Sequence, residues 1–282
     1  MVDSMLPVVH ERFCHDYRRI WLVGASTGIG EALLHELDAP GVHIVASART
    51  EATLHKACAN TVGSVKALTL DICEPGEIDA AVRDIGRSLH GLDLLIVNAG
   101  TCEYIDTATM DLDAIDRVMQ TNFYGAVRVI KAALPLLRAA CGGKVRPKLL
   151  VVSSSVTFQA LPRAHAYGAS KAALRYFTEC LHIDLQKEGI DVQIVSPGFV
   201  KTPLTEQNDF PMPFLISAED AAKIICKHLH SNVFDIVFPK PFIYLLKTFA
   251  GLPQRLKFRL LKNLSRHEPP ALPKPPQGEH QP

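Results

Sequence analysis

The chain has 282 residues, of which 48% are hydrophobic and 21% are charged, and its net charge at pH 7 is +1. That length allows one large α/β domain or two small ones, with an ample core. The near-neutral charge argues against nucleic acid as the main partner, because surfaces that bind phosphate backbones usually carry a basic excess.

The cysteines and the N-terminal segment both favour a reducing, cytoplasmic compartment. The seven cysteines form no Cys-x-x-Cys pair and no tight Cys/His cluster, so we expect free thiols and no metal site: Cys14, Cys58, Cys73, Cys102, Cys141, Cys180 and Cys226. Acidic and basic residues are mixed in residues 3–19, which argues against a signal peptide. No apolar run reaches the roughly 18 residues that cross a bilayer.

From residue 20 onward, short apolar runs alternate with helical patterns. The runs expected to be strands cover residues 20–23, 43–47, 65–70, 92–97, 148–152, 191–195 and 234–237. The expected helices cover residues 31–37, 51–59, 75–89, 112–140, 167–185 and 218–229. The strand runs are continuously apolar, as in a parallel sheet covered on both faces. The pattern predicts an α/β fold, a single doubly wound Rossmann-type domain with a parallel sheet of about seven strands.

A glycine-rich turn joins the first expected strand to the first helix. Its glycines follow the spacing Gly-x-x-x-Gly-x-Gly, at Gly24, Gly28 and Gly30. Glycines permit a tight turn and let a phosphate approach backbone N–H groups at a helix N-terminus. Such a turn is a weak signal alone, but its position after the first strand indicates a nucleotide site.

Tyr167 and Lys171 are four residues apart in an expected helix, so their side chains share one face. A phenol titrates at ~10, and a nearby ammonium group favours the phenolate. Such a pair can exchange a proton near neutral pH. A Tyr-x-x-x-Lys pair is common by chance, so its meaning depends on the rest of the chain.

Taken together, the motifs resemble those of the short-chain dehydrogenases/reductases of the classical type, over about residues 20–238. Six elements occur in the family's order: the glycine turn, Asn98-Ala99-Gly100, Asn122, Ser154, Tyr167-x-x-x-Lys171, and Pro197-Gly198 followed by Thr202. One departure is Val23, where the family's turn usually begins with Thr. We expect this to remove one structural hydrogen bond, since the three glycines remain.

The resemblance implies a catalytic tetrad of Asn122, Ser154, Tyr167 and Lys171. Ser154 would bond the substrate oxygen, and Tyr167 would deliver or remove the proton as hydride is transferred. Lys171 would lower the pKa of the tyrosine and bind the nicotinamide ribose, and Asn122 would hold a water that links Lys171 to solvent. Two adjacent serines compete with Ser154, but the 13-residue interval to Tyr167 selects it, as in the family.

The residues after the second strand indicate which dinucleotide binds. A site that prefers NAD has a carboxylate there, whereas the 2′-phosphate of NADP needs a cation. The chain reads Ala48-Arg49-Thr50, with no acid before Glu51. In the family, Asp at the Ala48 position marks NAD users and Arg at the next position grips the NADP phosphate. We therefore predict NADP(H) rather than NAD(H), with Arg49 as the clamp and Ser47 or Thr50 assisting; a solvated Arg49 is the alternative.

By the same resemblance, other residues surround the cofactor. Asp71 and Ile72 would flank the adenine, the Asn98 turn would line a ribose, and Thr202 would hold the nicotinamide amide. The full expected set is Gly24, Ser26, Gly28, Ile29, Gly30, Arg49, Asp71, Ile72, Asn98, Ala99, Gly100, Tyr167, Lys171, Pro197, Gly198, Val200 and Thr202.

The chain is divided into four expected segments. Residues 1–17 would form an N-terminal arm, and residues 18–238 the Rossmann-type catalytic domain. Residues 239–267 form a basic amphipathic extension, because residues 236–267 include seven Lys or Arg and no Asp or Glu. This extension could contact a membrane peripherally through residues 240–266; helices packed over the cleft or an oligomer contact are the favoured alternative. Residues 268–282, rich in proline, would be a disordered tail.

We predict an NADP(H)-dependent oxidoreductase that interconverts a hydrophobic secondary alcohol and its ketone. The apolar loop of residues 199–217 suits such a substrate, although its side chains could equally pack on the protein itself. A non-catalytic NADP-binding regulator or scaffold with the same fold is the alternative, but we would expect it to lack Tyr167 or Lys171. Family members often pair through their two long helices, here about residues 112–140 and 167–188, so a homodimer or homotetramer is expected.

Overall fold

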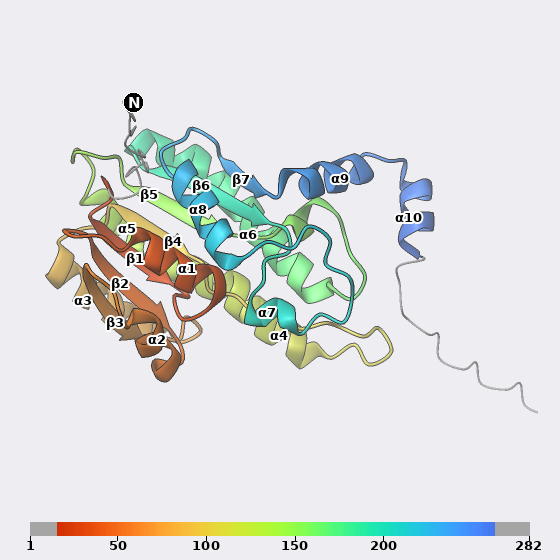
Figure 1. The fold of residues 1–282 in the computed structure, drawn as a ribbon, viewed down its shortest axis with the longest axis horizontal. Helices are drawn as coiled ribbons and strands as arrows, with labels where there is room; N and C mark the ends of the chain where they lie inside the picture. The colour runs from red at the N-terminus through yellow and green to blue at the C-terminus, as the bar shows by residue number, and fades with distance from the viewer. Residues whose placement is uncertain (1–15, 263–282) are drawn as a thin grey trace, which may run out of the picture.

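In the computed structural model, residues 16–262 are described, and their strands form one seven-stranded sheet (Figure 1). The strand order is β3-β2-β1-β4-β5-β6-β7, and every neighbouring pair is parallel. The strands are β1 (Arg19–Val23), β2 (His43–Ala48), β3 (Ser64–Thr69), β4 (Leu94–Val97), β5 (Lys148–Val152), β6 (Asp191–Pro197) and β7 (Asp235–Phe238). The predicted fold class is confirmed, and each expected strand is present with its ends within two residues.

Helices connect the strands and cover both faces of the sheet (Figure 1). They are α1 (Gly28–Leu37), α2 (Glu51–Cys58), α3 (Pro75–Leu89), α4 (Leu112–Met119), α5 (Ala126–Arg138), α6 (His165–Leu185), α7 (Pro203–Glu206), α8 (Ala218–His228), α9 (Lys240–Ala250) and α10 (Gln254–Lys262). Two features differ from the expectation. The loop before α8 contains the short helix α7, and a π-helical turn interrupts the helix expected over residues 112–140.

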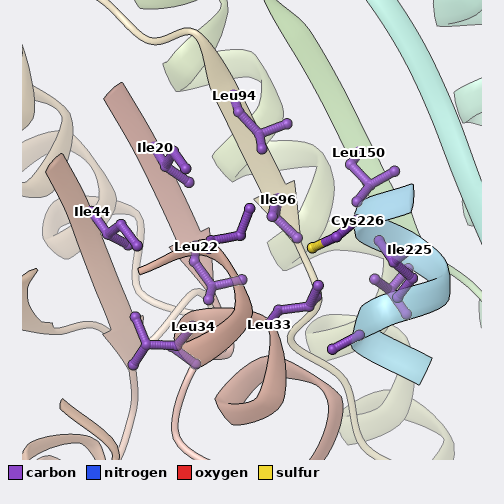
Figure 2. Close-up of a cluster of buried hydrophobic side chains, with 14 of the residues drawn as sticks. Ile20, Leu22, Leu33, Leu34, Ile44, Leu94, Ile96, Leu150, Ile225 and Cys226 are labelled. Atoms are coloured by element: carbon purple, nitrogen blue, oxygen red, sulfur yellow. The ribbon is translucent and has the colours of Figure 1, made fainter. Parts of the chain in front are cut away.

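Alternate strand residues point to opposite faces, and each face builds its own core. On one face Ile20 and Leu22 pack with Leu33 of α1 and Ile225 of α8 (Figure 2). On the other face Trp21 packs among residues that α3, α5 and α6 contribute, Ile85, Val129 and Leu174. Because both faces are covered, the strands are apolar along their whole length, which is the pattern that the sequence shows.

The site follows from the strand order. After β1 the chain moves outward to β2 and β3, and it then returns to place β4 on the other side of β1. The connections after β1 and β4 therefore diverge at the carboxyl ends of the strands, and a crevice opens between them.

The C-terminal extension begins as an integral part of the domain. Phe242 and Ile243 of α9 are buried, and α9 packs against β7 and the turn that follows β5. This part of the extension therefore packs on the domain, as in the favoured alternative. Residues 263–267 of the extension, the tail of residues 268–282 and residues 1–15 of the expected arm lie outside the described residues.

Two findings concern the chain's thiols and its helices. Among the six cysteines of residues 16–262, no two are joined by a disulfide, and Cys14 lies outside this range. Among the same residues, no helix combines the length and the apolar character that crossing a membrane requires.

The contacts of the glycine turn give a first testable expectation. A Cβ atom on Gly30 would lie 1.8 Å from the Gly24 carbonyl oxygen, whereas one on Gly76, near the start of α3, would meet nothing within 4 Å. Gly30→Ala should therefore destabilise the protein by about 3 kcal/mol and lower Tm by at least about 5 °C in thermal unfolding. The matched Gly76→Ala variant should keep or slightly raise Tm. Equal Tm values for the two variants would contradict the packing described.

Candidate active site

A cleft of about 1030 Å³ lies at the carboxyl ends of the strands. It is lined by residues that follow six of them, including the Gly24 turn, Arg49, Asp71, Asn98, Ser154 and Gly198. Of the expected site residues, all line this cleft except Gly30 and Asn122, which lie behind its wall. Strand ends that are far apart in the sequence thus share one cavity.

The glycine turn is held against both neighbouring strands. The backbone N–H groups of Gly24 and Ala25 donate to the Ser47 carbonyl oxygen at 2.7 and 3.0 Å. The Asn98 side-chain amide donates to the Gly24 carbonyl oxygen at 2.7 Å. Gly24 has φ +87°, and a Cβ atom there would lie 2.5 Å from the Ala99 nitrogen. Only glycine fits this position. The tight turn brings the N-terminus of α1 to the cleft, where its backbone N–H groups favour an anionic group.

The two expected helpers of Arg49 differ in position. Thr50 lines the cleft beside Arg49, and both residues are exposed. Ser47 is fully buried, and its hydroxyl oxygen accepts a hydrogen bond from the Trp21 indole at 3.0 Å. Ser47 is therefore part of the core, and of the two only Thr50 can assist Arg49.

Asn122 sits in the π-helical turn, Gln120–Gly125, and its side chain is fully buried. Its amide donates to the Thr101 carbonyl oxygen at 2.8 Å and to the Ser170 hydroxyl at 3.0 Å, and its Oδ1 accepts from the Thr101 N–H at 2.7 Å. Ser170 in turn donates to the Tyr167 carbonyl oxygen at 2.8 Å. Asn122 thus ties the turn after β4 to the first part of α6.

Gly100 separates Asn122 from the ammonium group of Lys171. A Cβ atom on Gly100 would lie 3.2 Å from both the Asn122 Oδ1 and the Lys171 Nζ. Because both amide hydrogens of Asn122 are engaged, a water on this side chain would have to donate to Oδ1. That position faces Lys171 across Gly100, which fits the relay that the resemblance implies.

Ser154, Tyr167 and Lys171 meet at the wall of the cleft. Ser154 ends the segment after β5, and its hydroxyl oxygen accepts from the Val156 N–H at 3.2 Å and makes a hydrogen bond with Tyr167. Lys171 is buried one helical turn after Tyr167, and its Nζ donates to the Val152 carbonyl oxygen at 3.0 Å. The three side chains come from two elements that pack side by side, so their arrangement depends on the fold and not on a flexible loop.

Burial controls the proton affinities of this group. It raises the pKa of Tyr167 to about 12, although the hydrogen bond with Ser154 acts in the opposite direction. Burial also lowers the pKa of Lys171 to about 8. The lowered tyrosine pKa expected from the Tyr-x-x-x-Lys spacing is therefore not observed, because desolvation penalises the phenolate and the ammonium alike.

A lid, defined as residues 199–217, closes one side of the site. The ring centroids of Phe199 and Phe210 lie 6.0 Å apart, and those of Phe210 and Tyr104 also lie 6.0 Å apart. The Tyr104 hydroxyl donates to the Asn208 side chain, which fastens the lid to the segment after β4. The apolar side chains of the lid thus pack on one another and on Tyr104. This supports the interpretation that they pack on the protein itself.

Several residues of the site were not identified from the sequence. Ser170 lies within the Tyr167 motif, but only the fold shows its bond to Asn122. Cys102 is placed so close to Lys171 and Tyr167 that their charges affect each other, and burial raises the pKa of its thiol to about 11. Arg117 and Glu103 line the cleft and form an ion pair at 2.6 Å. No sequence signal links these residues, because they belong to separate loops and helices.

Comparisons with known proteins agree with this architecture. A family model described as short chain dehydrogenase matches residues 18–211. An uncharacterized oxidoreductase of Myxococcus xanthus is 33% identical over 227 residues, which cover 79% of this chain and 88% of that protein. The 11-beta-hydroxysteroid dehydrogenase 1A of Arabidopsis thaliana is 33% identical over 196 residues, which cover 68% of this chain and 54% of that protein. The chain thus spans about half the length of the plant relative.

A solved structure shows the same fold. A short chain dehydrogenase from Burkholderia cenocepacia, in complex with NADP, superposes with a TM-score of 0.73. The two chains are 23% identical, and the superposition covers 86% of this chain and 96% of that one.

The lowered pKa of Lys171 predicts a change of stability with pH. Between about 8, its pKa in the folded protein, and the ordinary value of 10.5, the unfolded chain binds more protons than the folded chain. Stability should therefore rise with pH in this window. Relative to Lys171→Met, the wild type should gain about 2 kcal/mol in unfolding free energy between roughly pH 7.5 and 9.5, measured by urea unfolding. The exposed Lys223→Met variant is the control and should show a constant difference; a constant difference for Lys171→Met would refute the shift.

Proposed function

The chain belongs to the short-chain dehydrogenase family and is an oxidoreductase, and we propose that it uses NADP(H) to interconvert a hydrophobic secondary alcohol and its ketone. The observation that carries this proposal is that Ser154, Tyr167 and Lys171 line the same cleft as the Gly24 turn. A proton donor and a dinucleotide site in one cavity are what a carbonyl reduction requires.

The residues present fit a dinucleotide. The Gly24 turn leaves no room for a side chain, and it lies where the N-terminus of α1 meets the cleft, which suits a pyrophosphate. Gly100 has no side chain that would fill the cleft beside Lys171 and Asn122. When bound, NADPH supplies the hydride, and the protein's own groups hold the substrate and manage the proton.

We assign the proton donor role to Tyr167. With a pKa of about 12, its phenol is protonated at neutral pH and suits the protonation of a carbonyl oxygen during reduction. Ser154, already hydrogen-bonded to Tyr167, holds the same substrate oxygen beside the phenol. Lys171 titrates near 8, so it can return a proton to the site at physiological pH, with Asn122 holding the water that connects it to solvent.

We assign the choice of NADP(H) over NAD(H) to Arg49. Arg49 is exposed and lines the cleft after β2, Thr50 lies beside it, and the neighbouring Ala48 carries no charge. A cation without a competing carboxylate at this point favours a ribose 2′-phosphate. The Burkholderia relative, which has the same fold, binds NADP.

A hydrophobic substrate is supported by the lid and by one relative. The lid's aromatic side chains pack on one another, but its apolar residues Val200, Pro203 and Leu204 line the cleft. The Arabidopsis relative is named for a hydroxysteroid, a polycyclic secondary alcohol. A lipid-like or polycyclic compound fits these walls better than a sugar, which would leave its hydroxyl groups unpaired.

We also propose that two copies of the chain pair through α4–α5 and α6, as family members often do. Apolar side chains on these helices are exposed, among them Leu112, Tyr124 and Ile183. Burial of such residues in a homodimer, or in a homotetramer, would remove them from water.

The Tyr167 assignment is tested by turnover. NADPH oxidation should be followed against a panel of hydrophobic ketones for the wild type and Tyr167→Phe. Loss of the phenolic proton should lower kcat by about 10²- to 10⁴-fold, while NADPH binding stays within a few-fold. Tyr176→Phe, on the exposed face of the same helix, is the matched control and should keep wild-type turnover. Equal turnover of Tyr167→Phe and the wild type would refute the role of Tyr167 as proton donor.

The Arg49 assignment is tested by cofactor affinity. Arg49→Ala should raise the Kd for NADPH at least about tenfold, through loss of a charge-assisted hydrogen bond, and change the Kd for NADH less than about twofold. Arg87→Ala, an exposed arginine of α3, should change neither affinity. Fluorescence titration measures both, and an unchanged ratio of the two affinities in Arg49→Ala rules out the clamp.

A further inference from the structure

The two helices of the extension differ in how they meet the rest of the protein. α9 has a buried side, formed by Phe242 and Ile243, and an outer side where Tyr244 and Leu245 are 59% and 58% exposed. α10 projects beyond the domain (Figure 1), and among residues 254–262 none is buried. Its apolar side chains Leu256, Phe258 and Leu260 are 44%, 54% and 43% exposed. An exposed apolar group of this kind marks an interaction surface.

The surface is cationic as well as apolar. Residues 236–262 contain six Lys or Arg and no Asp or Glu: Lys240, Lys247, Arg255, Lys257, Arg259 and Lys262. Arg255, Arg259 and Lys262 follow helical spacing and share one side of α10. Among the described residues, no carboxylate forms an ion pair with any of the six; Lys247 and Lys257 instead lie over the rings of Phe158 and Phe258.

We propose that α10 and the outer side of α9 lie on an anionic lipid surface. A helix with cations along one side and apolar side chains beside them binds the interface of an anionic bilayer, where the apolar groups enter the headgroup region. Each Lys or Arg near such a surface contributes about 1 kcal/mol. A neutral or cationic partner would leave the uncompensated charge of this surface unexplained.

The surface adjoins the substrate side of the site. Phe242, on the buried side of α9, meets the lid residues Phe199 and Phe214 at ring distances of 5.3 and 6.3 Å. Lys247 lies 4.6 Å from the ring centroid of Phe158, in the turn that follows Ser154. A protein held by α10 would therefore have its lid next to the bilayer, where a hydrophobic ketone concentrates. This last step, delivery of substrate from the lipid, rests on the proposed function; the lipid contact itself does not.

The contact is tested by co-sedimentation of the full chain with vesicles, without turnover. Vesicles of phosphatidylcholine alone are compared with vesicles containing 30% phosphatidylglycerol, a composition chosen on the order of natural anionic membranes. The wild type should partition at least about tenfold more strongly to the anionic vesicles. The triple variant Arg255→Glu, Arg259→Glu, Lys262→Glu should lose this preference. The triple variant Lys187→Glu, Lys223→Glu, Lys227→Glu makes the same change of charge at exposed sites elsewhere and should retain it.

A second variant tests whether apolar side chains of α10 enter the bilayer, in addition to the attraction between opposite charges. Leu256→Ser, Phe258→Ser, Leu260→Ser should also weaken binding to anionic vesicles, because the apolar contact is lost. All variants should keep wild-type turnover of a water-soluble ketone, so a failure here is distinct from a failure of the proposed chemistry. Equal binding of the wild type to both vesicles, or no effect of the α10 charge reversal, overturns the proposal. Dissociation of a dimer by the α10 substitutions, with no vesicle binding in the wild type, would identify a second copy of the chain as the occupant instead.

Discussion

The structure depends on how closely the turn after β1 approaches the turn after β4. Gly24 has no space for a side chain beside Ala99, and the Asn98 amide bonds the Gly24 carbonyl oxygen. The two strands are neighbours in the sheet although two strands separate them in the sequence. This junction sets the floor of the cleft, because the connections on its two sides diverge and the N-terminus of α1 lies between them. The proposed dinucleotide site is thus a consequence of strand order, and the absence of a side chain at Gly24 makes it sterically possible.

Tyr167 and Lys171, the proposed reacting groups, lose hydration in their buried positions. Burial keeps Tyr167 protonated and lowers the pKa of Lys171 to about 8, because both the phenolate and the ammonium lose hydration there. The chain of hydrogen bonds from Asn122 through Ser170 to the Tyr167 carbonyl holds α6 in place despite this loss of hydration. The π-helical turn has a clear role in this arrangement, since it carries Asn122. A preorganised, protonated phenol is suited to reduction.

The sheet and the cleft could be predicted because they depend on local patterns. Continuous apolar runs predicted all seven strands, and the family resemblance implied about half of the residues that line the cleft. Properties that depend on the third dimension could not be predicted this way. Two residues near the end of β2 occupy different environments, since Ser47 bonds Trp21 in the core while Arg49, two residues later, lines the cleft. The prediction of a lowered pKa for Tyr167 was wrong for the same reason. The sequence spacing indicates the nearby ammonium group, whereas the desolvation that raises the pKa depends on which residues cover the phenol.

In the proposed mechanism, hydride transfer and proton transfer meet in this one cleft. The most direct measurement uses NADPH deuterated at both C4 positions of the nicotinamide, a hydrophobic ketone and mass spectrometry of the alcohol. We expect a single deuterium on the carbinol carbon, with the hydroxyl proton taken from solvent through Tyr167. An alcohol without deuterium on that carbon would contradict this mechanism.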